Sequence, residues 1–177
     1  MRRWWIGALV VILALAAATM WRERGDPEAD AAPLPKVSEA PQPVEVLRAL
    51  DLDAPALRIE VLAVTRPARD IVEVRLVFTN RDAAAVVALG DRFAETPTEA
   101  GTLSGAFLTT ASGTSRAFVL RDAAGAPQCS KGLEQLGPGE RKEAWVRFAS
   151  PGPASATVTL TVKNAPPLDG LVLPETR

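Results

Sequence analysis

Histidine and tyrosine are absent from this sequence, and cysteine occurs only once. The absence of histidine removes the most versatile general base and the commonest metal ligand of proteins. A single cysteine excludes an internal disulfide bond and any cysteine-rich zinc site. The net charge of the chain is −1, so the chain lacks the excess of positive charge that nucleic-acid binding normally requires. We therefore expect no cofactor, no metal site, no catalytic residue of the usual kinds and no nucleic-acid partner.

A long run without charge lies near the start of the sequence, from Trp4 to Trp21. Its 18 residues would form a helix of roughly 27 Å, close to the ~30 Å hydrocarbon core of a bilayer. Tryptophans at both ends are typical of membrane interfaces. Residues 1–21 are therefore predicted to be a single-pass transmembrane anchor. The alternative is a signal peptide cleaved after Ala16-Ala17-Ala18, which would release the protein to the periplasm.

The arginines that flank this run do not decide its orientation, because two precede it and two follow it. The α-amino group tips the balance towards a cytoplasmic N-terminus. Both the anchor and the signal peptide then place the rest of the chain outside the cytoplasm.

Residues 22–55 are rich in proline and alanine, with six prolines in the stretch. Proline fixes φ and removes a hydrogen-bond donor, so neither a long helix nor a central strand can run through it. The composition predicts a semi-extended linker, with about 3.1 Å per residue where it adopts the polyproline II conformation. Residues 44–50 are the one apolar part, and they fit either a short helix or a first strand.

From residue 56 to residue 177 the sequence alternates between apolar and polar residues. In 71–80 the even positions from 72 to 78 are apolar, and 155–162 repeats the pattern. Successive side chains of a strand point to opposite faces, so both stretches predict half-buried strands of an antiparallel sheet. Glycine and proline turns separate them from further expected strands, which lie at 57–64, 86–89, 107–110, 116–120 and 142–148. About seven short strands without a helical pattern predict an all-β, two-layer β-sandwich.

Two motifs stand out in the expected sandwich. The first is the valine-rich strand Val72-Glu73-Val74-Arg75-Leu76-Val77-Phe78-Thr79-Asn80, which ends in Thr-Asn. The second is the turn Leu136-Gly137-Pro138-Gly139-Glu140, followed by Trp145-Val146-Arg147-Phe148. Both resemble motifs of bacterial extracytoplasmic immunoglobulin-like domains. The resemblance implies an antiparallel immunoglobulin-like β-sandwich held at the bacterial inner membrane by an N-terminal anchor and a proline-rich stalk, and it implies no catalytic residue.

Two places in the expected sandwich are candidates for an interaction with a partner. Residues 90–101 form a long connection, and Arg92 and Phe93 stand together in it; arginine and aromatic residues are enriched at protein interfaces. The alternative is that Phe93 covers the core while Arg92 is solvated. The lone Cys129 can form an intermolecular disulfide or act as a reactive thiol, or it is a small buried apolar residue.

Two classes of function remain. The first is a non-catalytic interaction module, tethered to the membrane and docked on an envelope protein or complex. The alternative is a small-molecule-binding domain or an enzyme that uses carboxylates such as Asp91, Glu95 and Glu99, because paired acids can hydrolyse glycosides without histidine. The sandwich contains only one tryptophan, so it lacks the aromatic platforms expected around a sugar. The sequence therefore favours the interaction module.

Overall fold

The computed structural model describes residues 45–154 and 156–175. The predicted anchor at 1–21 and most of the predicted linker at 22–55 lie outside these residues. Within the described part the fold is all-β with antiparallel pairing, as the alternating pattern predicted. The only helical element there is a short 3₁₀ turn, η1 (Pro97–Glu99). No described helix is long and apolar enough to cross a membrane.

The described residues contain ten strands, where about seven were expected, and they form three sheets. The first sheet has the order β1-β2-β3-β8 and contains β1 (Arg48–Leu52), β2 (Leu57–Ala68), β3 (Ile71–Asn80) and β8 (Arg141–Ala149). The second has the order β10-β9-β5-β6 and contains β10 (Leu168–Val172), β9 (Thr157–Thr161), β5 (Phe107–Thr110) and β6 (Arg116–Phe118). A small third sheet pairs β4 (Val87–Ala88) with β7 (Gln135–Leu136).

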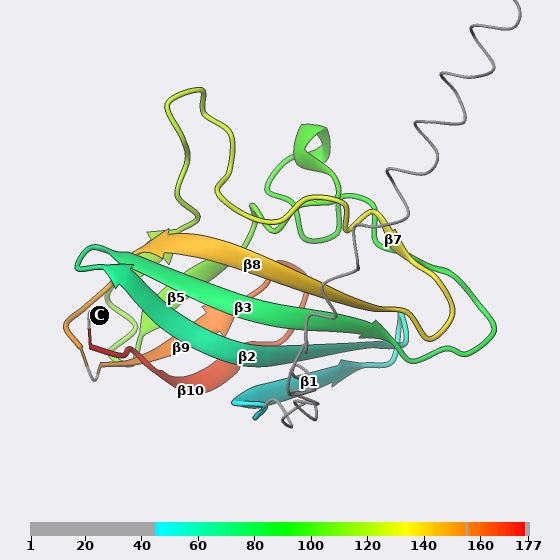
Figure 1. Ribbon diagram of the computed structural model, residues 1–177, viewed down its shortest axis with the longest axis horizontal. Helices are drawn as coiled ribbons and strands as arrows, with labels where there is room; N and C mark the ends of the chain where they lie inside the picture. The colour runs from blue at the N-terminus through cyan, green and yellow to red at the C-terminus, as the bar shows by residue number, and fades with distance from the viewer. Residues whose placement is uncertain (1–44, 155, 176–177) are drawn as a thin grey trace, which may run out of the picture. The chain divides into compact units, whose positions relative to one another are not determined.

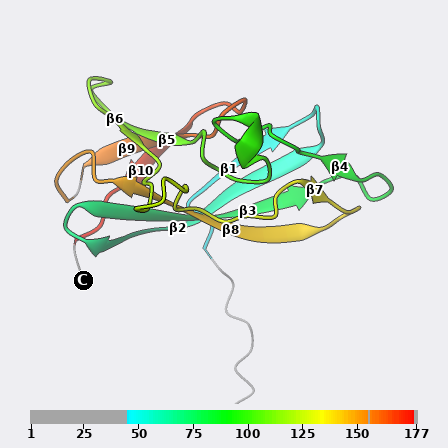
Figure 2. The same ribbon diagram turned by 90° about the horizontal axis from the view of Figure 1, so that it is seen from above.

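The first and second sheets lie in two layers with one hydrophobic core between them (Figures 1 and 2). Figure 2 shows β2, β3 and β8 in one layer and β5, β9 and β10 in the other. Along β3, Val72, Val74, Leu76 and Phe78 are fully buried. Glu73, Arg75 and Thr79 on the other face are more exposed, because only one face of the sheet meets the other layer, whereas Val77 on that face is buried as well. The period-two pattern of the sequence is the direct result of this packing.

Strand β10 was not expected, and its geometry explains why. Its pairing with β9 shifts register between Leu168 and Leu171, and Gly170 between them has a φ of +74°. Such a bulge interrupts the alternation that identifies a strand in a sequence.

Across the two layers, Arg48 of β1 donates hydrogen bonds to the carbonyls of Asp169 (2.8 Å) and Gly170 (3.1 Å). The first sheet thus begins inside the stretch 44–50, at the edge that faces β10.

Asn80, the last residue of β3, holds two turns together from a buried position. Its Nδ2 donates to the carbonyls of Ala85 and Gly137, both at 2.8 Å, and its Oδ1 accepts from the amide of Asp82 at 2.9 Å. Buried backbone groups outside strands need such partners. The Thr-Asn end of this strand is therefore a structural device that joins the turn after β3 to the turn before β8.

The connection between β4 and β5, residues 89–106, covers the part of the core near the end of β3. Phe93 is only 2% exposed, and its ring centroid lies 5.4 Å from that of Phe78. Lys163 Nζ donates to the Ala94 carbonyl at 2.7 Å and ties this connection to the turn after β9. Of the two alternatives for Phe93, the structure has the one in which it covers the core, and the ring has no surface to offer a partner.

The burial of Phe93 gives a first prediction. Phe93→Ala should lower the free energy of unfolding by about 3 kcal/mol or more, because it leaves a cavity in the core. Phe118→Ala is the matched control, since Phe118 is 64% exposed and its loss should change that free energy by about 0.5 kcal/mol or less. Urea unfolding of the full chain measures both. Equal losses for the two variants would contradict the assigned role of Phe93.

Candidate functional site

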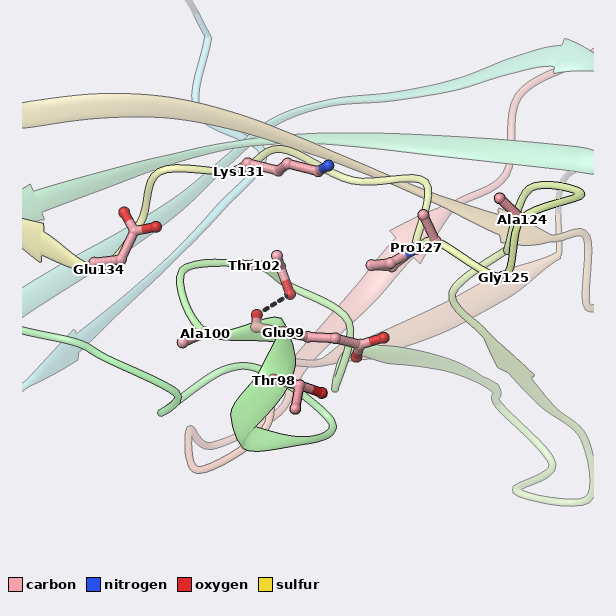
Figure 3. A pocket seen from close by; sticks show the side chains of 10 residues that line it. Thr98, Glu99, Ala100, Thr102, Ala124, Gly125, Pro127, Lys131 and Glu134 are labelled. Atoms are coloured by element: carbon pink, nitrogen blue, oxygen red, sulfur yellow. Dashed lines mark hydrogen bonds between the residues drawn. The ribbon is translucent and has the colours of Figure 1, made fainter.

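A cleft between two long connections is the candidate site (Figure 3). One wall is formed by residues 98–102 around η1, and the other by residues 124–134 of the connection from β6 to β7. Its volume is about 400 Å³. The lining is mostly polar or small, and consists of Thr98, Glu99, Ala100, Thr102, Ala124, Gly125, Ala126, Pro127, Lys131 and Glu134.

The floor of the cleft is fixed by backbone hydrogen bonds that join the two connections. The amides of Leu89 and Gly90 both donate to the Glu134 carbonyl at 2.8 Å. Gly101 donates to the Gly90 carbonyl at 2.8 Å, and Leu133 donates to the Gly101 carbonyl at 2.9 Å. Gly101 has a φ of +73°, and a Cβ there would lie 2.3 Å from Glu134 Oε1. This position therefore requires glycine.

Arg121 binds Glu99, which lines the cleft, and Glu95, which precedes η1 and does not line the cleft. Its guanidinium lies 2.7 Å from a carboxylate oxygen of Glu95 and 2.6 Å from one of Glu99, and it also donates to the Gly125 carbonyl at 2.8 Å. The hydrogen bond from Arg121, with a smaller contribution from Ser104, lowers the pKa of Glu99 below its usual value. Glu99 is therefore ionised at neutral pH, and it is poorly suited to act as a general acid.

The two buried hydroxyls behind the cleft are already committed to hydrogen bonds. Thr102 Oγ1 donates to the Glu99 carbonyl at 2.7 Å, which is the dashed line of Figure 3. Ser104 Oγ accepts from the amide of Glu95 at 2.8 Å. Both hydroxyls stabilise the irregular backbone around η1. The carboxylate that contacts Ser104 is Glu99, which is paired with Arg121 and has a lowered pKa, so it is a weak base for activating a nucleophile.

Cys129 lies in the core and is 5% exposed. Burial raises the pKa of its thiol above the ordinary value, so the nucleophilic thiolate is scarce at neutral pH. Its strand-like segment bridges to Val146 of β8. In the folded chain the thiol has the position of a small apolar core residue, and its sulfur offers little surface for an intermolecular disulfide.

The residues singled out from the sequence are distributed over several places. Glu95 and Glu99 meet at Arg121, whereas Phe93 and Cys129 are in the core. Arg92 is half-buried; its Nη2 donates to the Ala54 carbonyl at 3.3 Å, and its buried Nε has no partner among the described residues. Asp91 is exposed and does not line the cleft.

Sequence reasoning missed Arg121 and Lys131. The spacing of Glu95 and Glu99 was visible in the sequence, but nothing in it connects them to an arginine in another connection more than twenty residues away. Among the described residues, no group of three or more aspartate, glutamate, cysteine or histidine side chains is placed to hold a metal ion.

Comparison with known proteins gives no matching family and no matching curated protein. The chemistry of the cleft therefore has to be interpreted from its own geometry. Glu99 is paired with Arg121 and the hydroxyls are bonded internally, while Lys131 and Glu134 form no ion pair within the described residues. This arrangement suits a rigid binding surface better than a proton-transfer site.

Replacing Arg121 tests the pairing at the cleft. Because Glu99 has a lowered pKa in the folded chain, its pairing stabilises the fold above the unfolded pKa of about 4.3 and is lost as the pH falls through the folded pKa. Arg121→Gln should therefore lower the melting temperature at pH 7, and its difference from the wild type should shrink below about pH 4.3. Arg75→Gln is the control, because Arg75 is 65% exposed and its pair with Glu73 is long, at 3.7 Å. A difference in melting temperature between Arg121→Gln and the wild type that is the same at all pH values would contradict the pairing.

The burial of Cys129 predicts slow modification by a thiol reagent. In the native chain the reaction with a maleimide should be slow, and in urea it should reach the rate of a free thiol, because the reagent needs an exposed thiolate. The control is Ala123→Cys in a Cys129→Ser background, since Ala123 lies in an exposed turn. Mass spectrometry follows both reactions. Equally fast native modification at 129 and 123 would contradict the burial of Cys129.

Proposed function

We propose that this chain is a membrane-tethered, extracytoplasmic interaction domain with an immunoglobulin-like β-sandwich, which docks on an envelope protein and catalyses no reaction. The two-layer arrangement of antiparallel sheets supports the sandwich. The apolar run from Trp4 to Trp21 and the proline-rich stretch after it support the bacterial inner-membrane anchor and the stalk. The internal pairing of Glu95, Glu99 and Arg121 supports binding over catalysis.

The observation that carries this proposal is an exposed aromatic patch, formed by Phe107, Arg116 and Phe118. Phe118 is the most exposed large apolar side chain of the described residues, at 64%. Its ring centroid lies 6.3 Å from that of Phe107, and the Arg116 guanidinium carbon lies 4.6 Å from the centroid of the Phe107 ring. Aromatic residues and arginine dominate the binding energy of protein interfaces.

The position of the patch also favours docking. Strand β6 is an edge strand of the second sheet. Directly after it the chain passes to the first sheet, where Val119 bridges to Phe148 of β8. Phe118 therefore stands at the boundary between the two layers, on backbone that is fixed from both sides. A rigid aromatic anchor loses little conformational entropy when a partner binds.

The second candidate function is the binding of a small molecule in the cleft. Its volume of about 400 Å³ lies within the range of ligand sites. Lys131 is exposed, and in Figure 3 it stands on the wall opposite Glu99. The cleft has few apolar side chains to hold a ligand, so we place this candidate second.

Substitution of Phe118 tests the interaction module. In native membranes, crosslinking followed by mass spectrometry should capture an envelope protein with the wild-type chain and lose most of it with Phe118→Ser. Val172→Ser is the matched control, because Val172 is 58% exposed on β10, at the opposite edge of the same sheet. It should leave capture unchanged. If Phe118→Ser and Val172→Ser have the same effect on capture, the patch is not the docking surface.

A further inference from the structure

We propose that a second, separate site binds a carboxylate group through Arg66. The site is the hollow between the β2–β3 turn and the loop after β8, which we call the Arg66 hollow. It is lined by Arg66, Arg69, Asp70, Ser150, Pro151, Gly152 and Pro153 and has a volume of about 570 Å³. It shares no residue with the cleft or with the aromatic patch, and the proposal does not depend on either of them.

Arg66 is unusual because it carries a buried charge. It is 8% exposed and is the one buried charged residue in the described part of the chain. Its Nε and Nη2 donate to the Arg69 carbonyl at 3.0 and 2.6 Å, and Nη2 also donates to the Gly152 carbonyl at 3.1 Å. All of these acceptors are neutral. No described carboxylate lies within 4.0 Å of its guanidinium.

A buried charge without a counter-ion is costly, and proteins normally pair it. Glu73, whose side chain is 15% exposed, follows this rule, because it is paired with Arg147 at 2.9 Å. At Arg66 the neutral carbonyls hold the guanidinium in place but leave its charge uncompensated. An anion that enters the hollow would supply the missing partner.

The geometry leaves part of the guanidinium for that anion. Nη1, with two N–H bonds, has no acceptor among the described residues, while Nε and Nη2 are fixed by carbonyls. The Ser150 hydroxyl donates to the Gly152 carbonyl at 2.9 Å and so helps to fix the acceptor on the loop side. Both N–H bonds of Nη2 and that of Nε are used, so Nη1 is the nitrogen that remains to donate to an oxygen of an anion.

The charge of the lining indicates the class of anion. Two arginines and one aspartate line the hollow, which gives a single net positive charge. That charge matches a carboxylate, which carries one negative charge, better than a phosphate dianion, whose second charge increases the repulsion from Asp70. The carboxylate can belong to a small organic acid or to an acidic side chain or C-terminus of another protein.

Nuclear magnetic resonance on the full, isotopically labelled chain in detergent tests this proposal. Sodium acetate is the probe, with sodium chloride and sodium phosphate at matched ionic strength as comparisons. The backbone amide signals that are followed are those of the non-proline residues of the hollow and its turn, Arg66, Ala68, Arg69, Asp70, Ser150 and Gly152. Acetate should shift these signals saturably, chloride should not, and phosphate should bind more weakly. A peptide with an acidic C-terminus, compared with its amidated form, then distinguishes a protein source from a small acid.

Variants separate a binding role from a merely structural one. Arg66→Gln should lose the saturable acetate shift, and Arg69→Gln should weaken acetate binding severalfold. Arg69→Gln should not disturb the fold, because Arg69 bonds Arg66 through its backbone carbonyl and not through its side chain. Arg75→Gln, on the exposed face of the first sheet, should bind acetate like the wild type. An acetate response in the wild type that equals the chloride response overturns the proposal. Retention of the acetate shift in both Arg66→Gln and Arg69→Gln also overturns the proposal. Tighter binding of phosphate than of acetate overturns the assignment of the ligand as a carboxylate.

Discussion

The core between the two sheets has to be closed beyond the end of β3, and the chain does this with irregular backbone instead of a strand. Such backbone carries N–H and C=O groups towards the interior, and each of them needs a partner. The hydrogen bonds through Gly90, Gly101 and Glu134 supply those partners from the connection between β6 and β7. Closing the core thus fixes two connections against each other, and the cleft between them is a consequence of that closure. A side chain at Gly101 would have to adopt a left-handed φ of +73° and would displace the Glu134 side chain.

The same constraint explains why the acidic residues of the cleft are poor candidates for catalysis. Glu95 and Glu99 belong to the irregular segment, and their negative charges stand next to each other. Arg121 compensates both and, through the Gly125 carbonyl, connects η1 to the opposite wall. Arg66 is in the opposite situation, because its charge is buried among neutral carbonyls. Ionic groups that are already paired stabilise a shape, whereas a buried ion without a counter-ion retains the capacity to bind one.

The parts of the fold that follow from local alternation could be predicted from the sequence, and the parts that depend on long-range contact could not. Strand β3 has the predicted bounds because its apolar residues alternate from Val72 to Phe78, and β5, which was bounded by turn residues, also has the predicted bounds. Strand β10 escaped prediction, since a bulge at Gly170 breaks its pattern. In the cleft, the spacing of the two glutamates could be recognised, but their arginine lies in another connection. The contact between the rings of Phe93 and Phe78 likewise forms only in the folded chain, so the local sequence does not reveal it.

Phe93 and Phe118 show how position, and not residue type, decides what an aromatic side chain does. Phe93 stands in irregular backbone, where no periodicity assigns it to a face, and the gap in the core next to Phe78 takes it up. Phe118 stands in a strand, between the buried residues Ala117 and Val119, so the pleat itself turns it outward. A single exposed apolar residue is common on protein surfaces. A phenylalanine that the strand fixes outward beside a second ring and an arginine is less easily explained by folding, because burying it would require a shift of register that exposes the core residues on either side.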